Sequence, residues 1–178
     1  MLSNKEAVLL GLVLEKPKHA YEVEKDIEER DMKYWTEISM SSVYKLLAKL
    51  EKREYLKSEV ALSGNNVAQK IYSVTERGKK VFKGKIKELL SVWHPLIHPI
   101  DISLANLHRL SKKEVVERLS KYSESLDKMI KCYLELEQFL IEHKCPLGNI
   151  QLATRRIYLL RAEKKWLSKF MGEYKNGE

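Results

Sequence analysis

In the second half of the chain, apolar residues follow an unbroken alternation of steps of four and three residues. The first run extends from Val115 to Leu140, and the second extends from Ile150 to Tyr174 with one lysine among its members. A repeat that averages about 3.5 residues stays on one side of a helix and forms the seam of a coiled coil. The turn-forming segment HKCPLGN separates the two runs. We therefore predict two long helices that fold back on each other.

The second of these helices carries more apolar surface than one partner helix covers, because Trp166 and Phe170 lie beside its seam. We predict that a second copy of the chain covers the remainder, so that the chain forms a homodimer. The alternative is a two-helix hairpin without a partner, since a pair of helices can bury one stripe alone. The residues predicted for dimerisation are Leu119, Tyr122, Leu126, Met129, Tyr133, Leu160, Trp166, Leu167 and Phe170.

A short segment with two prolines, HPLIHPI at residues 94–100, precedes this helical region. Proline lacks a backbone N–H and cannot continue a helix, so the segment is predicted to be a linker. It would join a first domain, residues 1–93, to a helical, coiled-coil-like dimerisation domain, residues 101–178.

The first domain is predicted to contain three helices, a β-hairpin and a fourth helix. Ser3 and Glu6 match a capping box at the start of the first helix. The segment HAYEVEKDIEER has the spacing of a second helix, and a third follows over residues 40–54 with Ser39 as its cap. The runs LKSEVAL and VAQKIYSVT flank a Gly/Asn turn and predict a hairpin, after which Thr75 caps the fourth helix. The predicted fold class is mainly α with a small β-hairpin wing, a winged helix-turn-helix followed by two long helices.

The positive charge of the chain begins at the third helix. The chain has a formal net charge of +8; residues 1–32 hold five basic and eight acidic residues, whereas residues 33–93 hold thirteen and six. The apolar side of the third helix is a stripe of Val43, Leu46, Leu47 and Leu50, which is predicted to be buried. The opposite side presents lysines and serines, and such a basic face is typical of a polyanion-binding surface.

The start of the third helix adds donors to this face. A helix N-terminus has unpaired N–H groups and a partial positive charge, so Ser41 and Ser42 are predicted to receive a DNA phosphate or a base edge. Lys45, Lys49 and Lys52 would attract phosphates, and the small Ala48 between them would allow close approach to a groove. The alternative is a lysine face that only meets solvent.

Three segments in this order resemble motifs of the PadR family of transcriptional regulators. PKHAYEVEKDIEER resembles its P-x-H-G-Y-E segment, ISMSSVYKLLAKLEKREYL its S-x-G-S-[IV]-Y-x-x-L-x-x-L-E recognition helix, and QKIYSVTERGKK its basic-Tyr-x-[LV]-T-x-x-G wing. The resemblance covers about residues 5–85, and the two long helices are similar to the dimerisation region of the longer, AphA-like members. Ala20 and Ser41 stand where the family has glycine, and Gln69 replaces the first basic residue of the wing.

The resemblance implies a sequence-specific, DNA-binding transcriptional regulator, which we expect to be a repressor. As a homodimer, it would present two third helices to successive major grooves of a pseudo-palindromic operator, about 34 to 36 Å apart. The alternative from another class is a winged-helix module that binds protein and scaffolds an assembly without binding DNA.

Other residues complete the predicted DNA-binding set. Tyr44 either contacts a phosphate or packs against the second helix, and Tyr21 either contacts DNA or is a buried anchor. Lys70, at the base of the wing, is predicted to meet the phosphate backbone. Asn66 suits a turn first and the minor groove second. The full set is Tyr21, Ser41, Ser42, Tyr44, Lys45, Lys49, Lys52, Asn66 and Lys70.

Trp35 and Trp93 are candidates for lining a cavity that takes a small aromatic effector, as some PadR-like dimers do. The alternative is that both tryptophans are ordinary core residues at element junctions.

Several classes of function are not expected. The sequence shows no paired nucleophile and base, no phosphate-binding glycine loop and no carboxylate constellation, so we expect no enzyme. Cys132 and Cys145 are too far apart for a zinc knuckle and too few for a disulfide framework, so we expect neither a metal nor a cofactor. No apolar run approaches about 18 residues and the start of the chain lacks a cleavage site. We expect a protein of the reducing cytoplasm without a membrane span.

Overall fold

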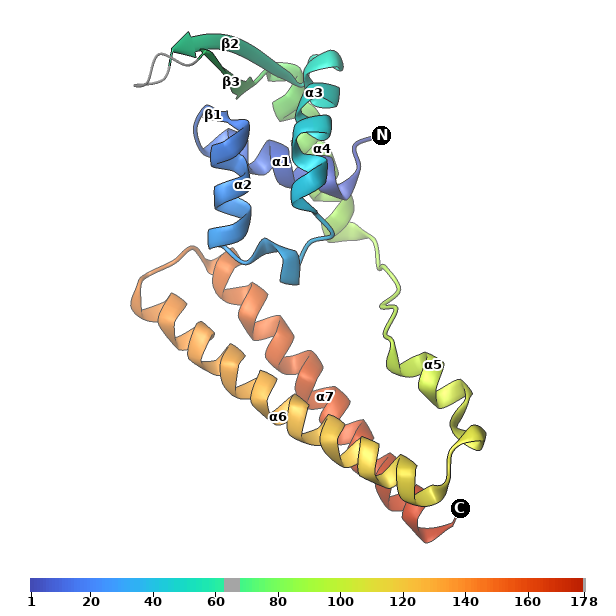
Figure 1. Cartoon of the computed structure of the whole chain (residues 1–178). Helices are drawn as coiled ribbons and strands as arrows, with labels where there is room; N and C mark the ends of the chain where they lie inside the picture. Colours follow the sequence, from blue (N-terminus) through green and yellow to red (C-terminus); the bar gives the residue numbers. More distant parts are fainter. Residues whose placement is uncertain (63–67, 178) are drawn as a thin grey trace. The chain divides into compact units, whose positions relative to one another are not determined.

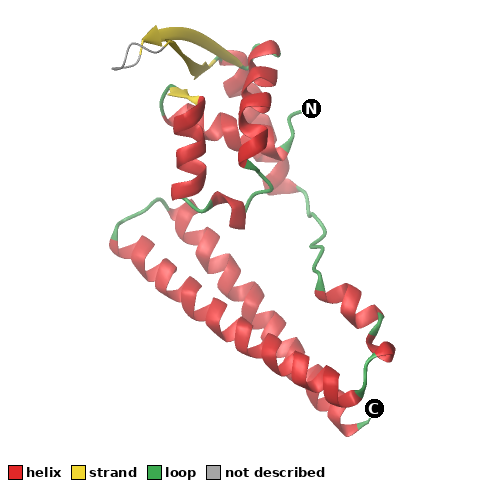
Figure 2. Cartoon of the chain, in the orientation of Figure 1, coloured by secondary structure: helices red, strands yellow, loops and turns green. Residues whose placement is uncertain are grey.

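The computed structural model describes residues 1–62 and 68–177 of the chain (Figure 1). The chain divides into two compact units, Met1–Pro95 and Leu96–Glu178. Helices make up most of both units, and the strands are confined to the first one (Figure 2). The predicted fold class, mainly α with a small β wing and two long helices, is confirmed.

The described residues of the first unit form four α-helices, and the first and the last of them start at the predicted caps. They are α1 Asn4–Glu15, α2 Ala20–Glu29, α3 Val43–Lys52 and α4 Glu76–Ser91. At α1 the Ser3 hydroxyl accepts from the amide of Glu6, whose carboxylate accepts from the Ser3 amide. At α4 the Thr75 hydroxyl accepts from the Gly78 amide at 3.0 Å. These side chains satisfy amides that the first turn of a helix leaves unpaired.

The third helix begins differently from the prediction. Residues Met40–Ser42 form a turn of 3₁₀ helix and the α-helix starts at Val43. The Ser39 side chain makes no capping hydrogen bond; instead, the Ser42 hydroxyl donates to the Ser39 carbonyl at 2.7 Å. Serine side chains compete for nearby backbone groups, and this favours a tighter turn over a regular helical start.

The sheet has one strand more than predicted. Strands β2 Leu56–Leu62 and β3 Ala68–Val74 pair antiparallel as the predicted hairpin, and β1 Lys18–His19 adds to the other side of β3, giving the order β1-β3-β2. A two-residue strand is too short to show a period in the sequence. The turn that was predicted to contain Asn66 lies outside the described residues.

The register of the hairpin decides which side chains face α3. Ser58 lies opposite Tyr72, and Val60 lies opposite Lys70. Opposed residues point to the same face, and so do residues two apart on one strand, so all four share one face of the hairpin. Tyr72 is buried in the core on this face.

One apolar core holds the first unit together. It combines the buried stripe of α3 with residues from α1, α2 and the sheet, and it is made mainly of Leu9, Leu10, Val23, Ile27, Val43, Leu47, Leu50, Leu56 and Tyr72. The predicted stripe is confirmed, with Val43, Leu47 and Leu50 fully buried and Leu46 half-buried against them. Burial of each such side chain favours folding by about 1.5 to 3 kcal/mol.

An ion cluster around the buried Lys18 joins the turn after α1 to α2. The Lys18 side chain is only 1% exposed, and its ammonium pairs with Asp26 and, at 3.0 Å, with Glu15. Arg30 binds Glu15 through two bonds of 2.6 and 2.8 Å. Arg30, and after it Lys18, lowers the pKa of the Glu15 carboxyl from 4.5 to about 2. A buried lysine needs such partners because its charge is otherwise unfavourable away from water.

We expect this cluster to make the first unit sensitive to acid. The Glu15 carboxylate stabilises the folded form at pH values above about 4.5, the ordinary pKa in the unfolded chain, and this contribution is lost as the pH falls toward about 2. Urea unfolding between pH 5 and pH 2 should show a steeper loss of stability in the parent chain than in Glu15→Gln. Parallel pH profiles for the two chains would contradict the assignment.

In its described residues, the second unit has one short α-helix and two long ones. They are α5 Ile100–Ala105, α6 Lys112–Glu142 and α7 Leu147–Asn176, and α6 and α7 pack along each other (Figure 1). Ser111 and Glu114 form a capping box at the start of α6. Helix α5 begins at the last residue of the predicted linker.

Several seam residues are buried between the two long helices. Leu119, Leu126 and Leu167 are 7% exposed or less, so their apolar surface is already covered within one chain. The charged seam residue, Lys164, pairs with Asp127 on α6. The Tyr122 hydroxyl donates to Glu163 at 3.1 Å, and burial together with this carboxylate raises the pKa of Tyr122 to about 12.

Other apolar residues of these helices remain exposed. Met129 is 43% exposed and Trp166 is 36% exposed, while Tyr133, Leu160, Phe170 and Tyr122 are half-buried. A role in dimerisation therefore stays a prediction for the whole set, and the exposed members have surface that a second chain could cover. Of the helices in the described residues, none combines the length and the apolar character needed to cross a membrane.

Candidate nucleic-acid interface

Helix α3 presents a polar face because its apolar stripe is fixed against α1 and α2. Opposite that stripe, the side chains of Ser41, Tyr44, Lys45, Ala48, Lys49 and Lys52 are all exposed. Ser42 is half-buried, since its hydroxyl is bonded to the Ser39 carbonyl. The face therefore combines exposed positive charge with small side chains over more than two helical turns.

The three lysines of this face have different surroundings. Lys45 and Lys52 form no ion pair with any residue that the structure describes. The Lys49 ammonium lies 3.0 Å from the carboxylate of Glu6, which is 1% exposed and also binds Arg53 at 3.1 Å. Burial alone would raise the pKa of Glu6, but the Ser3 amide, Lys49 and Arg53 together lower it. Lys49 is thus partly neutralised within the chain, and Lys45 and Lys52 are not.

The wing lysine is also paired. The Lys70 ammonium lies 3.2 and 3.4 Å from the two carboxylate oxygens of Glu51, at the end of α3. The Ser58 hydroxyl donates to the same carboxylate, and this bond, followed by Lys70, lowers the pKa of Glu51. Glu51 therefore stays charged in mildly acidic solution and offsets part of the positive charge of the wing.

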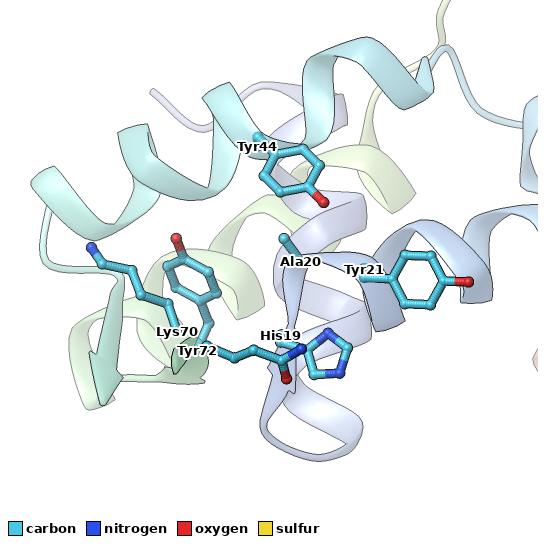
Figure 3. Close-up of a pocket in the computed structure, with 7 residues that line it drawn as sticks. His19, Ala20, Tyr21, Tyr44, Lys70 and Tyr72 are labelled. Carbon is cyan, nitrogen blue, oxygen red and sulfur yellow. The ribbon is translucent and has the colours of Figure 1, made fainter. Parts of the chain in front are cut away.

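A hollow of about 300 Å³ lies between the start of α2, helix α3 and strand β3. Figure 3 shows Tyr44 extending from α3 toward Ala20, with Lys70 and Tyr72 on the opposite wall. The lining residues are His19, Ala20, Tyr21, Tyr44, Gln69, Lys70 and Tyr72. Three residues of the predicted DNA-binding set, Tyr21, Tyr44 and Lys70, are thereby brought together from three elements.

The two tyrosines of the predicted DNA-binding set that line this hollow are surface residues. Tyr21 is 65% exposed, so the alternative of a buried anchor was wrong. Its ring stacks on His19, whose Nδ1 accepts from the Glu22 amide at 3.2 Å and caps α2. Tyr44 is 57% exposed, and partial burial together with the nearby Glu24 carboxylate raises its pKa. The Tyr44 hydroxyl is therefore a neutral donor at ordinary pH.

The two tryptophans do not meet at this hollow. Trp35 is 43% exposed and Trp93 is 82% exposed. The alternative in which both are core residues was wrong, because Trp35 follows a short 3₁₀ turn and α4 ends at Ser91, before Trp93. Among the described residues there is no cluster of three or more His, Cys, Asp or Glu placed to hold a metal ion.

Sequence reasoning missed the two acidic residues of the site. Glu6 was assigned only to a cap, and Glu51 was not singled out, although it ends the recognition-helix motif quoted above. Their partners lie far away in the chain, with Arg53 47 positions from Glu6 and Lys70 19 positions from Glu51. A helix periodicity cannot reveal such contacts; the acidic end of an otherwise basic helix face was the one available signal.

Solved structures with a similar fold cover nearly the whole chain. Bacillus subtilis PadR in complex with operator DNA matches with a TM-score of 0.77 and 15% identity, covering 95% of this chain and 98% of that one. The same protein in complex with p-coumaric acid matches with a TM-score of 0.73 and 16% identity, over 96% and 98% of the two chains. The Vibrio cholerae virulence activator AphA matches with a TM-score of 0.69 and 16% identity, over 98% and 100%. At these identities the matches show the fold.

The family comparison agrees with the motifs quoted above. The model of the transcriptional regulator PadR-like family matches residues 9–84, which include α2, α3, the hairpin and the first half of α4. The chain therefore contains a domain of the transcriptional regulator PadR-like family.

Proposed function

We propose that this protein is a sequence-specific DNA-binding transcriptional regulator that represses its target by occupying a pseudo-palindromic operator as a homodimer. The observation that carries the proposal is the exposed face of α3, where Lys45 and Lys52 have no carboxylate partner among the described residues. It lies in a PadR-like domain, and a PadR of the same fold has been solved on operator DNA.

The proposed docking follows the winged helix-turn-helix arrangement. Helix α3 would enter the major groove, with Ser41 and Lys45 toward bases and phosphates. The hollow that contains Tyr21, Tyr44 and Lys70 offers hydroxyl and ammonium donors to the phosphate backbone beside the groove. In this proposal the PadR-like domain binds DNA and catalyses no reaction.

The salt dependence of duplex binding tests the proposed function. Two protomers that each place Lys45 and Lys52 on phosphates make four contacts, so affinity should fall on the order of 100-fold between 50 and 200 mM salt. The operator is obtained by selecting fragments of genomic DNA that the full chain retains, and binding is followed by fluorescence anisotropy. Affinity that does not change with salt, or equal affinity for the selected and a scrambled duplex, would leave the protein-scaffold alternative in place.

The homodimer is supported by the apolar surface that the second unit leaves exposed. Met129 on α6 and Trp166 on α7 belong to this surface. Sedimentation of the full chain at micromolar concentration should therefore give the mass of two copies, and a monomer would remove the proposed two-fold match to the operator.

We also propose that a small aromatic molecule regulates DNA binding. This proposal is supported by Bacillus subtilis PadR, a protein of the same fold whose structure was solved in complex with p-coumaric acid. Trp35 and Trp93 remain candidates for contacting such an effector, since both present exposed indole rings. An effector would act by favouring a dimer whose two α3 helices no longer match successive major grooves.

A further inference from the structure

The carboxylate of Glu51 lies where the recognition helix, strand β2 and strand β3 meet. It accepts a hydrogen bond from Ser58 of β2 and pairs with Lys70 of β3 at 3.2 Å. Its side chain is 27% exposed, so water reaches it only partly. One side chain of α3 thus contacts both strands of the wing.

The contacts of Glu51 lie near the point where the hairpin leaves the core of the first unit. Ser58 and Lys70 point to the face of the hairpin that looks toward α3, as the pairing of Ser58 with Tyr72 requires. Tyr72 is buried in the core, but Val60 and Leu62 further along β2 are 70% and 69% exposed. Of the described contacts between α3 and the wing, those of Glu51 are therefore the outermost polar ones before the hairpin projects into solvent.

The chemistry of these contacts also suits a clamp, the name used here for the Glu51 carboxylate and its two donors, Ser58 and Lys70, which join α3 to the wing. Hydrogen bonds to a charged acceptor are stronger than bonds between neutral groups, and the two donors approach one carboxylate from different strands. Lys70 is one of the residues proposed to meet phosphate, so Glu51 also decides where the Lys70 ammonium is held before DNA arrives.

We propose that Glu51 is a positioning residue that fixes the wing at a set distance from the recognition helix, so that both fit one DNA duplex together. This inference rests on the proposed DNA-binding function. Removing the carboxylate has two separable consequences: the loss of a negative charge favours any duplex, and the loss of the clamp disfavours the one duplex whose groove and backbone match the fixed geometry.

The experiment compares Glu51→Ala with Glu59→Ala in the full chain. Glu59 is also on β2 and its removal changes the net charge equally, but its side chain is exposed and binds Lys57 at 3.4 Å on the other face of the hairpin. The ratio of affinities for the selected operator and a scrambled duplex should fall about tenfold in Glu51→Ala and stay unchanged in Glu59→Ala. If Glu51→Ala raises the affinity for the operator and for the scrambled duplex equally, so that their ratio is preserved, Glu51 acts only through its charge and the proposal is overturned.

Hydrogen exchange without DNA separates this proposal from the function it rests on. Backbone amides of residues 58–62 and 68–72 should exchange about tenfold faster in Glu51→Ala, and Glu51→Gln should restore most of the protection because its amide oxygen still accepts from Ser58. If no duplex is bound but this pattern holds, the DNA-binding function fails and the clamp stands. Unchanged exchange, or equal exchange in the Gln and Ala variants, overturns the clamp. Ser58→Ala, which leaves α3 untouched, provides the same test if Glu51→Ala does not fold.

Discussion

Replacing Gly78 by alanine is expected to lower the free energy of unfolding by about 3 kcal/mol or more. A Cβ atom at this position would lie 2.1 Å from the carbonyl oxygen of Tyr55 and 2.8 Å from Cγ1 of Val74. The Tyr55 carbonyl cannot easily withdraw, because it accepts hydrogen bonds from both the amide and the hydroxyl of Thr75. Circular dichroism during urea unfolding measures the change.

Gly84→Ala provides the matched control for this prediction. Gly84 lies in the same helix, and a Cβ atom there meets nothing within 4 Å. The same substitution should therefore stabilise the chain by roughly 0.5 to 1 kcal/mol, since alanine is the better helix former. Equal effects at the two glycines would show that the close approach of α4 to Tyr55 does not constrain the fold. The prediction also gives a physical reason for the glycine in the T-x-x-G motif of the wing.

Lys45→Glu is expected to weaken operator binding by at least about 100-fold at 0.1 M salt. Each lost phosphate contact removes about one decade of affinity at this salt concentration, and a dimer loses two contacts. The slope of log affinity against log salt should also become shallower by about 2. Fluorescence anisotropy over a salt series gives both quantities.

Two other lysines serve as controls for Lys45. Lys83→Glu makes the same change of charge on an exposed residue of α4 and should alter affinity much less. Lys49→Ala removes the ammonium that pairs with Glu6, so it should lower stability more than it lowers the salt slope. A slope that falls equally for Lys45 and Lys49 variants would mean that the internal pair opens fully on DNA.

The fold could be predicted largely because its signals are local. The seam of α6 and α7 repeats over many turns, and the capping residues Ser3, Thr75 and Ser111 act within a single turn. Strand β1 was missed because two residues carry no periodicity. The burial of Lys18 was missed for a related reason, since it depends on partners from two other segments.

The candidate site could be predicted only in part. Exposure of Lys45 follows from the burial of the opposite stripe, which the sequence shows directly. The pairing of Lys49 and Lys70 with acidic residues does not follow, because it arises from contacts between distant segments. A basic face predicted from one helix therefore overstates the charge that the folded domain offers to a polyanion.

The contacts of Arg53 have a practical consequence for handling the protein. Its guanidinium donates to the Met1 carbonyl at 3.2 Å and to Glu6, and Leu2 is only 3% exposed. The Met1 carbonyl and the buried Leu2 side chain are thus held close to the end of α3. An affinity tag fused ahead of Met1 would lie next to these contacts, whereas a tag placed beyond α7 would follow Gly177, the residue that caps the end of that helix.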